Sequence, residues 1–463
     1  MESAEAGGDR MKYFIDPFGC VKNQVDAETM MAFLNKEGWV STDAEQADVI
    51  IVNSCGFIES AKRESINAVM AWRSAYPRKK IILAGCLSQR YAAELEESLT
   101  EATVIFGDKD ISNIGQASAA ALRGERYEHS AASARNAAGG ASAVDEIESA
   151  LPERPLLSLP GSAYVKISEG CDNHCAFCSI PLIRGGLRSR TITAIIGECT
   201  ALLKRGVKEL CLIGQDIGSF GMDRGSQELP ELLAALSTLQ GDFWVRLLYI
   251  HPNHFPMQIL ALMCDDKRFL PYFDLPFQHG AAGVLKRMNR QQSADDYLAL
   301  LDHIRAALPD AVIRSTFLLG FPGETEKDMG ELFEFQEKSA LDWLGCFTYS
   351  REENTPAYSL KNRVPQKTAL ARKQQVEEKQ AAITKRRMER FIGRVFDVLV
   401  EEKIQGEELY LGRLFCHAPE VDGSAVISSD AVLEPGYFIR GKVFARAGFD
   451  LEIAPVRQKT YKS

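Results

Sequence analysis

The sequence predicts an α/β protein with an N-terminal parallel-sheet βα domain, a central partial (βα)6 TIM-like barrel and a small C-terminal β-barrel. Three observations lead to this fold class. The chain has 463 residues, which is too long for one hydrophobic core. Short apolar stretches alternate with helical periodicity over most of its length. After residue 393 the pattern changes to short strands separated by turn residues.

The first domain is predicted at residues 11–126, where four apolar strand candidates are each followed by a helical pattern. These strands are KYFIDPFGC, DVIIVNSCG, KIILAGC and TVIFGD. Repeated βα connectivity predicts a parallel sheet with helices on its faces. Residues 127–156 are rich in Ala, Ser and Gly and lack an apolar period, so they are predicted to form a flexible linker.

The central domain is predicted at residues 157–365. Its six strand candidates are AYVKIS, ELCLIGQD, FWVRLLYI, FDLPFQ, AVIRSTFLLGF and WLGCFTYS. A full TIM barrel needs eight βα units, so six predict an open, partial barrel. Thr325 followed by Asp328 predicts a capping box at one of its helices. Residues 366–392 are charged and helix-prone and are predicted to connect this domain to a β-barrel at 393–459.

Composition narrows the class of protein. No signal-peptide core and no run of eighteen apolar residues occurs, which indicates a cytoplasmic protein without membrane attachment. Eleven cysteines, an odd number, argue against a disulfide framework and for metal-binding or catalytic thiols. The formal net charge of -9 disfavours a general nucleic-acid-binding protein, whose surface would be basic.

The stretch EGCDNHCAFCSIP places Cys171, Cys175 and Cys178 within eight positions. A zinc site of three cysteines and His174 is awkward, because His174 directly precedes Cys175 and both would have to reach one tetrahedral ion. A four-iron cluster also has four corners, and cysteine thiolates are its usual protein ligands. Three thiolates leave one iron open, and an open position on a metal can bind a substrate directly. The spacing therefore favours such a cluster.

A second set of thiols, Cys20, Cys55 and Cys86, recurs at about the length of one βα unit. Each cysteine follows an apolar strand, so successive parallel strands would bring all three to the same carboxyl edge of a sheet. We expect a second three-thiolate iron–sulfur cluster there. The alternative is that these residues are small buried hydrophobes, which is the interpretation given to Cys199, Cys211, Cys264, Cys346 and Cys416.

The carboxyl ends of the other barrel strands supply further site candidates. In barrels of this kind these ends build the active site, and here they carry Gln215, Asp216, His251, Gln278 and the GFPGE stretch at 320–324. GFPGE can equally be a turn and a helix cap, and His251 can simply end a strand. The stretch RGGLRSR adds guanidinium groups suited to binding carboxylates or to surface ion pairs. These belong to Arg184, Arg188 and Arg190.

The CxxxCxxC motif, with the aromatic Phe177 before its last cysteine, resembles the radical S-adenosylmethionine superfamily. Two open clusters in one chain resemble its methylthiotransferase family, and the resemblance runs from about residue 11 to 457. It is carried by GCVKNQVDAE, NSCGFI and GCLSQRY in the first domain and by KISEGCDNHCAFCSIP and RGGLRSR in the second. The C-terminal barrel resembles a TRAM domain.

This resemblance implies two 4Fe-4S clusters, with S-adenosylmethionine as the second cofactor. One S-adenosylmethionine would supply a methyl group to a sulfur at the auxiliary cluster. A second would become the 5'-deoxyadenosyl radical that removes a hydrogen from an unactivated carbon. The chemistry resides on the cofactors, so no catalytic side chain is singled out. The candidate cofactor contacts of this chain are Phe177, Gln215, Asp216, Gln278, Arg314, Gly320 and Gly323.

The family divides into enzymes that act on tRNA adenosine and an enzyme that acts on the β-carbon of an aspartate in ribosomal protein S-twelve. The stretches LIGQDIGSFG, FDLPFQHG, IRSTFLLGFPGET and HAPEVDG resemble the second branch more closely. In the first of these, Asp216 stands where the tRNA enzymes usually have Asn. The resemblance also implies a low-potential electron donor such as a flavodoxin or a ferredoxin.

Charge gives an independent indication of the substrate. Residues 393–463 contain nine Lys and Arg against eleven Asp and Glu. An RNA-binding barrel should carry surplus positive charge, whereas an acidic one complements a basic ribosomal protein. Two alternatives remain open at this point: the same chemistry on tRNA, and a non-catalytic interaction protein that binds iron or zinc.

Overall fold

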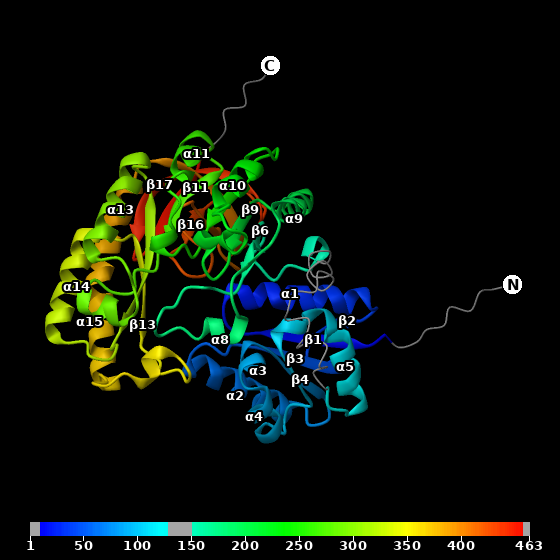
Figure 1. The fold of residues 1–463 in the computed structure, drawn as a ribbon. Helices are drawn as coiled ribbons and strands as arrows, with labels where there is room; N and C mark the ends of the chain where they lie inside the picture. The colour runs from blue at the N-terminus through cyan, green and yellow to red at the C-terminus, as the bar shows by residue number, and fades with distance from the viewer. Residues whose placement is uncertain (1–9, 128–150, 457–463) are drawn as a thin grey trace, which may run out of the picture. The chain divides into compact units, whose positions relative to one another are not determined.

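The computed structural model describes residues 10–127 and 151–456 (Figure 1). The chain divides into two compact units. The N-terminal unit comprises the described part of Met1–Leu157 together with the short segment Ser179–Gly185. The main unit comprises Ser158–Cys178 and the described part of Gly186–Ser463.

The N-terminal unit is built on a five-stranded parallel sheet of order β2-β1-β3-β4-β5. Its strands are β1 (Lys12–Pro17), β2 (Val40–Ser41), β3 (Val49–Ser54), β4 (Lys80–Gly85) and β5 (Val104–Phe106). Its helices are α1 (Val21–Lys36), α2 (Glu59–Ala75), α3 (Cys86–Arg90), α4 (Ala92–Ser98), α5 (Ile114–Arg123) and α8 (Ile180–Arg184).

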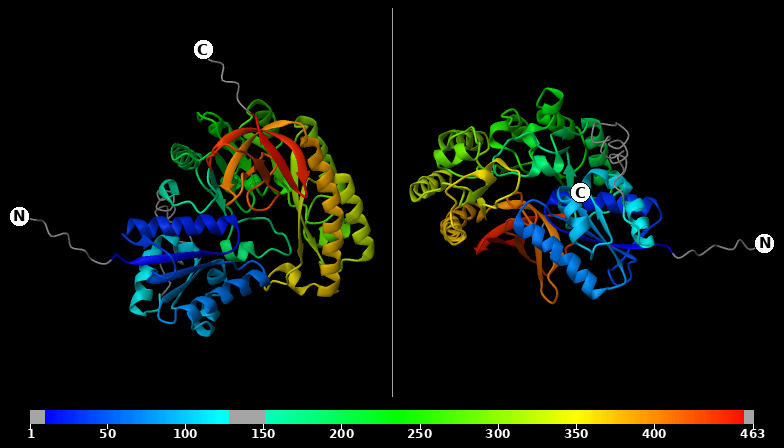
Figure 2. Two further views of the ribbon diagram at one scale, coloured as in Figure 1. Left: turned by 180° about the vertical axis from the view of Figure 1, so that it is seen from behind. Right: turned by 60° about the horizontal axis from the view of Figure 1, so that its bottom comes forward.

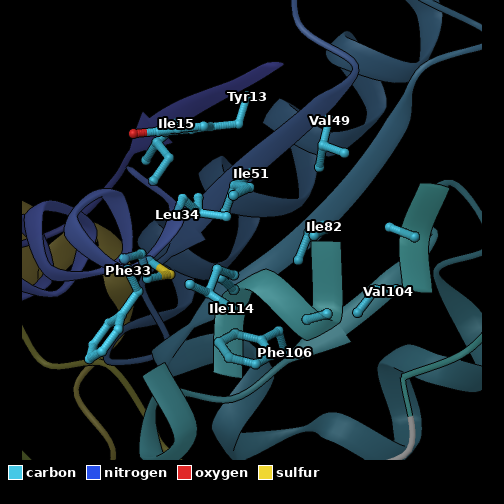
Figure 3. Close-up of a cluster of buried hydrophobic side chains, with 14 of the residues drawn as sticks. Tyr13, Ile15, Phe33, Leu34, Val49, Ile51, Ile82, Val104, Phe106 and Ile114 are labelled. Carbon is cyan, nitrogen blue, oxygen red and sulfur yellow. The ribbon is translucent and has the colours of Figure 1, made fainter. Parts of the chain in front are cut away.

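Strand alternation produces two apolar layers in this unit, because successive side chains point to opposite faces of the sheet. One layer joins Tyr13, Ile51 and Ile82 to residues of α1 and α5, and Figure 3 shows these strand side chains meeting Leu34 and Ile114. The other layer contains the intervening strand residues and the buried side chains of α2 and α4. The predicted parallel sheet with helices on both faces is confirmed.

The main unit contains a six-stranded parallel sheet of order β13-β12-β11-β10-β9-β6. Its strands are β6 (Ser162–Lys166), β9 (Glu209–Ile213), β10 (Trp244–Leu247), β11 (Phe269–Asp274), β12 (Val312–Leu319) and β13 (Trp343–Thr348). Because the sheet ends at β6 on one side and β13 on the other, it is the open six-unit barrel that the sequence predicts. A short hairpin of β7 (Ser168–Glu169) and β8 (Arg188–Ser189) follows β6.

Helices cover the outer face of this sheet (Figure 1). They are α9 (Ile192–Lys204), α10 (Leu229–Ser237), α11 (Ile259–Asp265), α12 (Ala282–Arg287), α13 (Ala294–Ala307) and α14 (Glu326–Ser339). The predicted capping box at the start of α14 is confirmed, since the Thr325 hydroxyl and the Asp328 backbone and carboxylate bond reciprocally. Short 3-10 helices occur at Asp108–Asn113, Leu151–Glu153, Ile217–Ser219, Met222–Arg224, Pro252–His254, Pro356–Ser359 and Glu389–Phe391.

The predicted connecting helix is α15 (Gln366–Met388), which packs along β13 and leads into the C-terminal barrel (Figure 2). The barrel is closed, with strand order β14-β15-β16-β18-β17. Its strands are β14 (Val395–Lys403), β15 (Leu409–Arg413), β16 (Ala425–Ser428), β17 (Phe438–Ala447) and β18 (Asp450–Pro455). In the part of the chain that the structure describes, no helix combines the length and apolar character needed to cross a membrane.

Buried charges attach the C-terminal barrel to the core sheet. Arg413 on β15 forms an ion pair with Glu209 at the start of β9 and donates to the Ser162 hydroxyl at 2.8 Å. Glu209 also pairs with Arg246 of β10 at 2.7 Å. Burial alone would raise the pKa of Glu209, but the guanidinium groups of Arg413 and Arg246 hold that pKa at about 2. The barrel is therefore fixed to the core by charges that are shielded from water.

The linker predicted at 127–156 lies mostly outside the described residues. Its described C-terminal part does not behave as a linker, because residues 151–157 pack on the N-terminal unit. Arg154 is fully buried and its guanidinium pairs with the buried carboxylate of Glu28 at 2.8 Å. The backbone N–H of Leu157 donates to the same carboxylate at 2.8 Å. Composition could not reveal this pair, because the average composition of the stretch does not show that one of its residues, Arg154, is buried against α1.

Candidate active site: two cysteine trios

Cys20, Cys55 and Cys86 follow three neighbouring strands, β1, β3 and β4, of the N-terminal sheet. Cys20 is the residue before α1, and Cys86 is the first residue of α3. The register pairs Ser54 with Gly85, so Cys55 and Cys86 come next at the same level of the sheet. The carboxyl edge predicted from the spacing is therefore where the three thiols lie.

Two glycines allow the cysteine loops to approach one another. Gly19 has a φ of +93°, and a Cβ on it would lie 3.0 Å from the Cβ of Cys55 and 3.4 Å from its sulfur. A Cβ on Gly56 would lie 2.6 Å from the backbone oxygen of Cys86. Any larger residue at either position would push the loops apart. The close packing of backbone around the thiols thus depends on residues that have no side chain.

Asn23 of α1 connects the ends of these strands. Its buried amide donates to the backbone oxygen of Ser54 at 2.8 Å and to that of Phe18 at 3.2 Å. The side-chain oxygen of Asn23 accepts a hydrogen bond from the Cys86 thiol at 3.3 Å. The same oxygen accepts from the guanidinium of Arg184, on α8, at 2.8 Å. Burial raises the pKa of the Cys55 thiol, while the Phe57 backbone N–H and the positive charge of Arg184 act in the opposite direction.

The second trio lies in the main unit, on the loop that follows β6 and β7. The backbone N–H of Cys178 donates to the backbone oxygen of Cys175 at 3.1 Å, which closes a turn. Ala176 donates its backbone N–H to Met288 at 2.9 Å, and the Asn289 amide donates to the His174 carbonyl at 2.7 Å. Two neighbouring residues just after α12 therefore hold this loop in place.

The chemistry of both trios fits the predicted clusters. All six cysteines are free thiols, and burial raises the pKa of Cys171 to about 11, so bound iron would have to displace its proton. Within residues 10–127 and 151–456, no three His, Cys, Asp or Glu side chains are placed to hold one metal ion. In a four-iron cluster each of the three thiolates would bind its own iron.

Asp216, predicted from the end of β9, is the centre of a buried polar network. Its carboxylate accepts from the Asn173 amide at 2.9 Å, from the Ser219 hydroxyl at 2.6 Å and from the backbone of His251 at 2.9 Å. Nδ1 of His254 lies 2.7 Å from the same carboxylate. Burial alone would raise the pKa of Asp216, but the hydrogen bond and charge of His254 hold it at about 2. Asp216 thereby holds the cysteine loop through Asn173.

Two other predicted residues lie beside this network. The Gln215 amide donates to Glu169 of β7 at 2.9 Å. The His251 ring contacts the guanidinium of Arg290, and burial together with the Arg290 charge lowers the pKa of His251 to about 3. The imidazole is therefore neutral at physiological pH. His251 does more than end a strand, since its backbone and its ring are both bound.

Gln278 has a positive φ of 72°, which is strained for a residue with a side chain. Its backbone pairs with β12, donating to Thr316 at 2.8 Å and accepting from Leu318 at 2.8 Å. Phe177 packs on the apolar cluster that contains Phe321 and Val284. Gln278 is thus fixed to β12 and Phe177 to this apolar cluster, and the predicted cofactor contacts of both residues stay predictions.

The GFPGE stretch and Arg314 have clear structural contacts. Glu324 accepts from the Gly320 backbone at 3.0 Å and pairs with Arg372 of α15 at 2.9 Å. A Cβ on Gly320 would lie 2.4 Å from that of Ala369, so this glycine allows α15 to pack closely. Gly323 also has a positive φ, and its backbone N–H donates to the backbone carbonyl of Asn362 at 2.8 Å. Arg314 pairs with Asp422 of the C-terminal barrel region and lies five residues before the end of β12.

The arginines of RGGLRSR separate into different environments. Arg184 is buried in the N-terminal unit, Arg188 is exposed on β8, and Arg190 pairs with buried Glu198 at 2.6 Å. The sequence did not identify Asn23, Asn173 or His254 as site residues. A signal was present for Asn23, because α1 buries several polar residues where an ordinary amphipathic helix would bury apolar ones. Of the five cysteines predicted as buried hydrophobes, four are buried and Cys264 is partly exposed.

Comparison with known proteins defines the class to which this arrangement belongs. Residues 12–107 match Uncharacterized protein family UPF0004, residues 165–335 match the Radical SAM superfamily, and residues 392–456 match the TRAM domain. Among solved structures, the radical S-adenosylmethionine methyltransferase TsrM from Kitasatospora setae has a TM-score of 0.52 at 13% identity. That alignment covers 75% of each chain and supports the fold. The chain is thus a radical SAM protein with a TRAM domain.

Curated relatives specify the family. A ribosomal protein uS12 methylthiotransferase RimO from Treponema denticola is 44% identical, covering 96% of this chain and 100% of the relative. The RimO of Syntrophomonas wolfei is 38% identical, covering 94% of this chain and 97% of the relative. The RimO of Thermotoga maritima is 39% identical over 89% of this chain and 93% of the relative. The chain belongs to the ribosomal protein uS12 methylthiotransferase RimO family.

Proposed function

We propose that this protein is a radical SAM methylthiotransferase that adds a methylthio group to the β-carbon of an aspartate in ribosomal protein uS12. The observation that carries the proposal is the placement of Cys20, Cys55 and Cys86 at the ends of three neighbouring strands. A second cysteine trio, Cys171, Cys175 and Cys178, occupies the loop after β7. The similarity to RimO relatives, which extends over nearly the full length of the chain, supports the same function.

Each trio would hold one 4Fe-4S cluster and leave one iron without a protein ligand. When bound, the clusters and two molecules of S-adenosylmethionine supply the electron, the radical and the methylated sulfur. The side chains of the protein position these groups. Asp216 and Asn173 fix the loop that carries Cys171, and Asn23 holds the strand ends around Cys86. The protein thus provides binding and orientation while the cofactors provide reactivity.

The assignment of uS12 as the substrate rests on the relatives and on charge. Residues 393–463 carry more acidic than basic side chains, which favours a basic protein partner over the phosphates of RNA. A ribosomal protein is made in the cytoplasm, so we place the enzyme there. A flavodoxin or ferredoxin is proposed as the electron donor, because reductive cleavage needs one electron at low potential.

The deciding experiment incubates the reduced holoenzyme with S-adenosylmethionine and, in parallel, with uS12 and with tRNA. Mass spectrometry should find a methylthio group in place of one hydrogen on an aspartate of uS12 and no such change in tRNA. A product on tRNA alone would refute the substrate assignment and favour the tRNA-modifying branch. Replacing dithionite by flavodoxin and its reductase tests the electron donor through the rate of 5'-deoxyadenosine release.

Cysteine variants test which trio is needed for cleavage of S-adenosylmethionine and which for methylthio transfer. Replacing Cys171, Cys175 and Cys178 by alanine should abolish 5'-deoxyadenosine release. Replacing the N-terminal trio should leave that release measurable but abolish methylthio transfer. Cys264→Ala is the matched control, because Cys264 lies on α11 outside both trios and should leave both reactions unchanged. The wild-type chain should hold about eight irons. A protein that binds iron but does not cleave S-adenosylmethionine, or that binds zinc alone, would be a non-catalytic metal-binding protein.

A further inference from the structure

A buried arginine lies against one of the N-terminal thiols. Arg184 is 4% exposed and belongs to α8, which packs beside α3 within the N-terminal unit (Figure 1). Its Nη2 lies 3.0 Å from the sulfur of Cys86 and 2.8 Å from the oxygen of Asn23. Its Nη1 lies 2.8 Å from the carboxylate of Asp26. The two terminal nitrogens of the guanidinium group therefore have different partners.

We propose that Arg184 is a positioning residue that sets the reduction potential of the auxiliary cluster through its hydrogen bond to the Cys86 sulfur. The inference rests on the proposed function, in which Cys20, Cys55 and Cys86 hold that cluster. A donor on a cysteinyl sulfur withdraws electron density and stabilises the reduced cluster, so it makes reduction easier. Arg184 therefore raises the potential of this cluster.

The fixed position of the guanidinium supports this role. Asp26 and Asn23 both belong to α1 and hold the arginine from two directions. A guanidinium is a rigid planar fork, so anchoring one nitrogen also fixes the direction of the other. The ion pair with Asp26 alone would explain a buried arginine, but it does not require the second nitrogen to face a cysteine sulfur.

The test uses the full-length chain with Cys171, Cys175 and Cys178 replaced by alanine, so that the auxiliary cluster is the one observed. This parent should bind about four irons after anaerobic reconstitution. Its midpoint potential is measured by titration with dithionite, followed by electron paramagnetic resonance. A parent that binds no iron would refute the proposed auxiliary cluster itself, which distinguishes that failure from failure of the role of Arg184.

Three variants of this parent separate the hydrogen bond from folding and from general charge. Arg184→Met should shift the midpoint potential to a more negative value. Because it leaves the Asp26 carboxylate buried without this cation, Asp26→Asn is combined with it to restore folding, and the negative shift should persist. Arg123→Gln is the control, since Arg123 is exposed on α5 in the same unit and pairs with Glu125.

An unchanged potential in the double variant, or an equal shift in Arg123→Gln, would overturn the proposal. A second measurement needs no change at Arg184. With ¹⁵N-labelled arginine, the reduced cluster of the parent should show a magnetic coupling to a guanidinium nitrogen. Absence of this coupling would equally overturn the proposal, even if the double variant fails to bind iron.

Discussion

Replacing Glu209 by glutamine should destabilise the main unit by about 3 kcal/mol. Glu209 is fully buried between Arg246 and Arg413. Its pKa is about 2 against an ordinary value of 4.5. The lowered pKa means that the folded chain stabilises the charged form of this carboxylate. Breaking a buried ion pair by removing one partner costs about 3–5 kcal/mol, and this sets the expected size of the loss.

The sign of the pH dependence follows from the lowered pKa. The contribution of Glu209 is present above pH 4.5 and is lost as the pH falls toward 2. Amide hydrogen exchange of β9 and β15 measures the local free energy of opening at several pH values. Glu209→Gln should lower this free energy at pH 7 and remove part of its decline in acid.

Asp310→Asn is the matched control. Asp310 pairs with Arg394 just before the C-terminal barrel, but about half of each side chain is exposed. Exposed pairs contribute at most about 1 kcal/mol, so this variant should resemble the wild type. A loss below about 1 kcal/mol in Glu209→Gln, or equal losses in the two variants, would refute the argument that the buried charges fix the barrel to the core.

Three further substitutions test packing at the described sites. Gly19→Ala should reduce the iron bound by the N-terminal trio, because the added methyl group would lie 3.0 Å from the Cβ of Cys55. Gly38→Ala is the control, since Gly38 has a similar φ and open space around it, and it should leave the iron content unchanged. Iron analysis of both variants measures the difference. Arg154→Met should destabilise the N-terminal unit by about 3–5 kcal/mol by leaving a buried carboxylate unpaired, and exchange of the α1 amides should report it. Gly320→Ala should cost about 1–3 kcal/mol, because its Cβ meets the facing helix at 2.4 Å; an unchanged melting temperature would contradict this.

Periodicity and spacing were sufficient to predict the fold class and the neighbouring positions of the N-terminal cysteines. Parallel strands end at a common edge, so a cysteine after each of β1, β3 and β4 had to lie there. Local sequence also specified the capping box of Thr325 and Asp328.

Long-range polar contacts could not be predicted in the same way. The ion pair of Arg314 is one example, because its partner Asp422 lies more than a hundred residues away in the chain, while the predicted cofactor contact of Arg314 stays a prediction. Arg184 was one of three arginines in a short stretch, and nothing local distinguishes it from exposed Arg188. Pairing of buried charges depends on which elements meet, and hydrophobic patterns do not encode that.

The division of the chain at Ser179–Gly185 has a consequence for biosynthesis. The N-terminal unit is a discontinuous domain, because this segment is synthesised after the first strand of the main unit. As the nascent chain leaves the ribosome, the five-stranded sheet is complete before the guanidinium that faces Asp26 and Cys86 has been made. The surroundings of Cys86 are therefore finished only after translation has passed Cys178, so the first domain cannot mature before the second has begun.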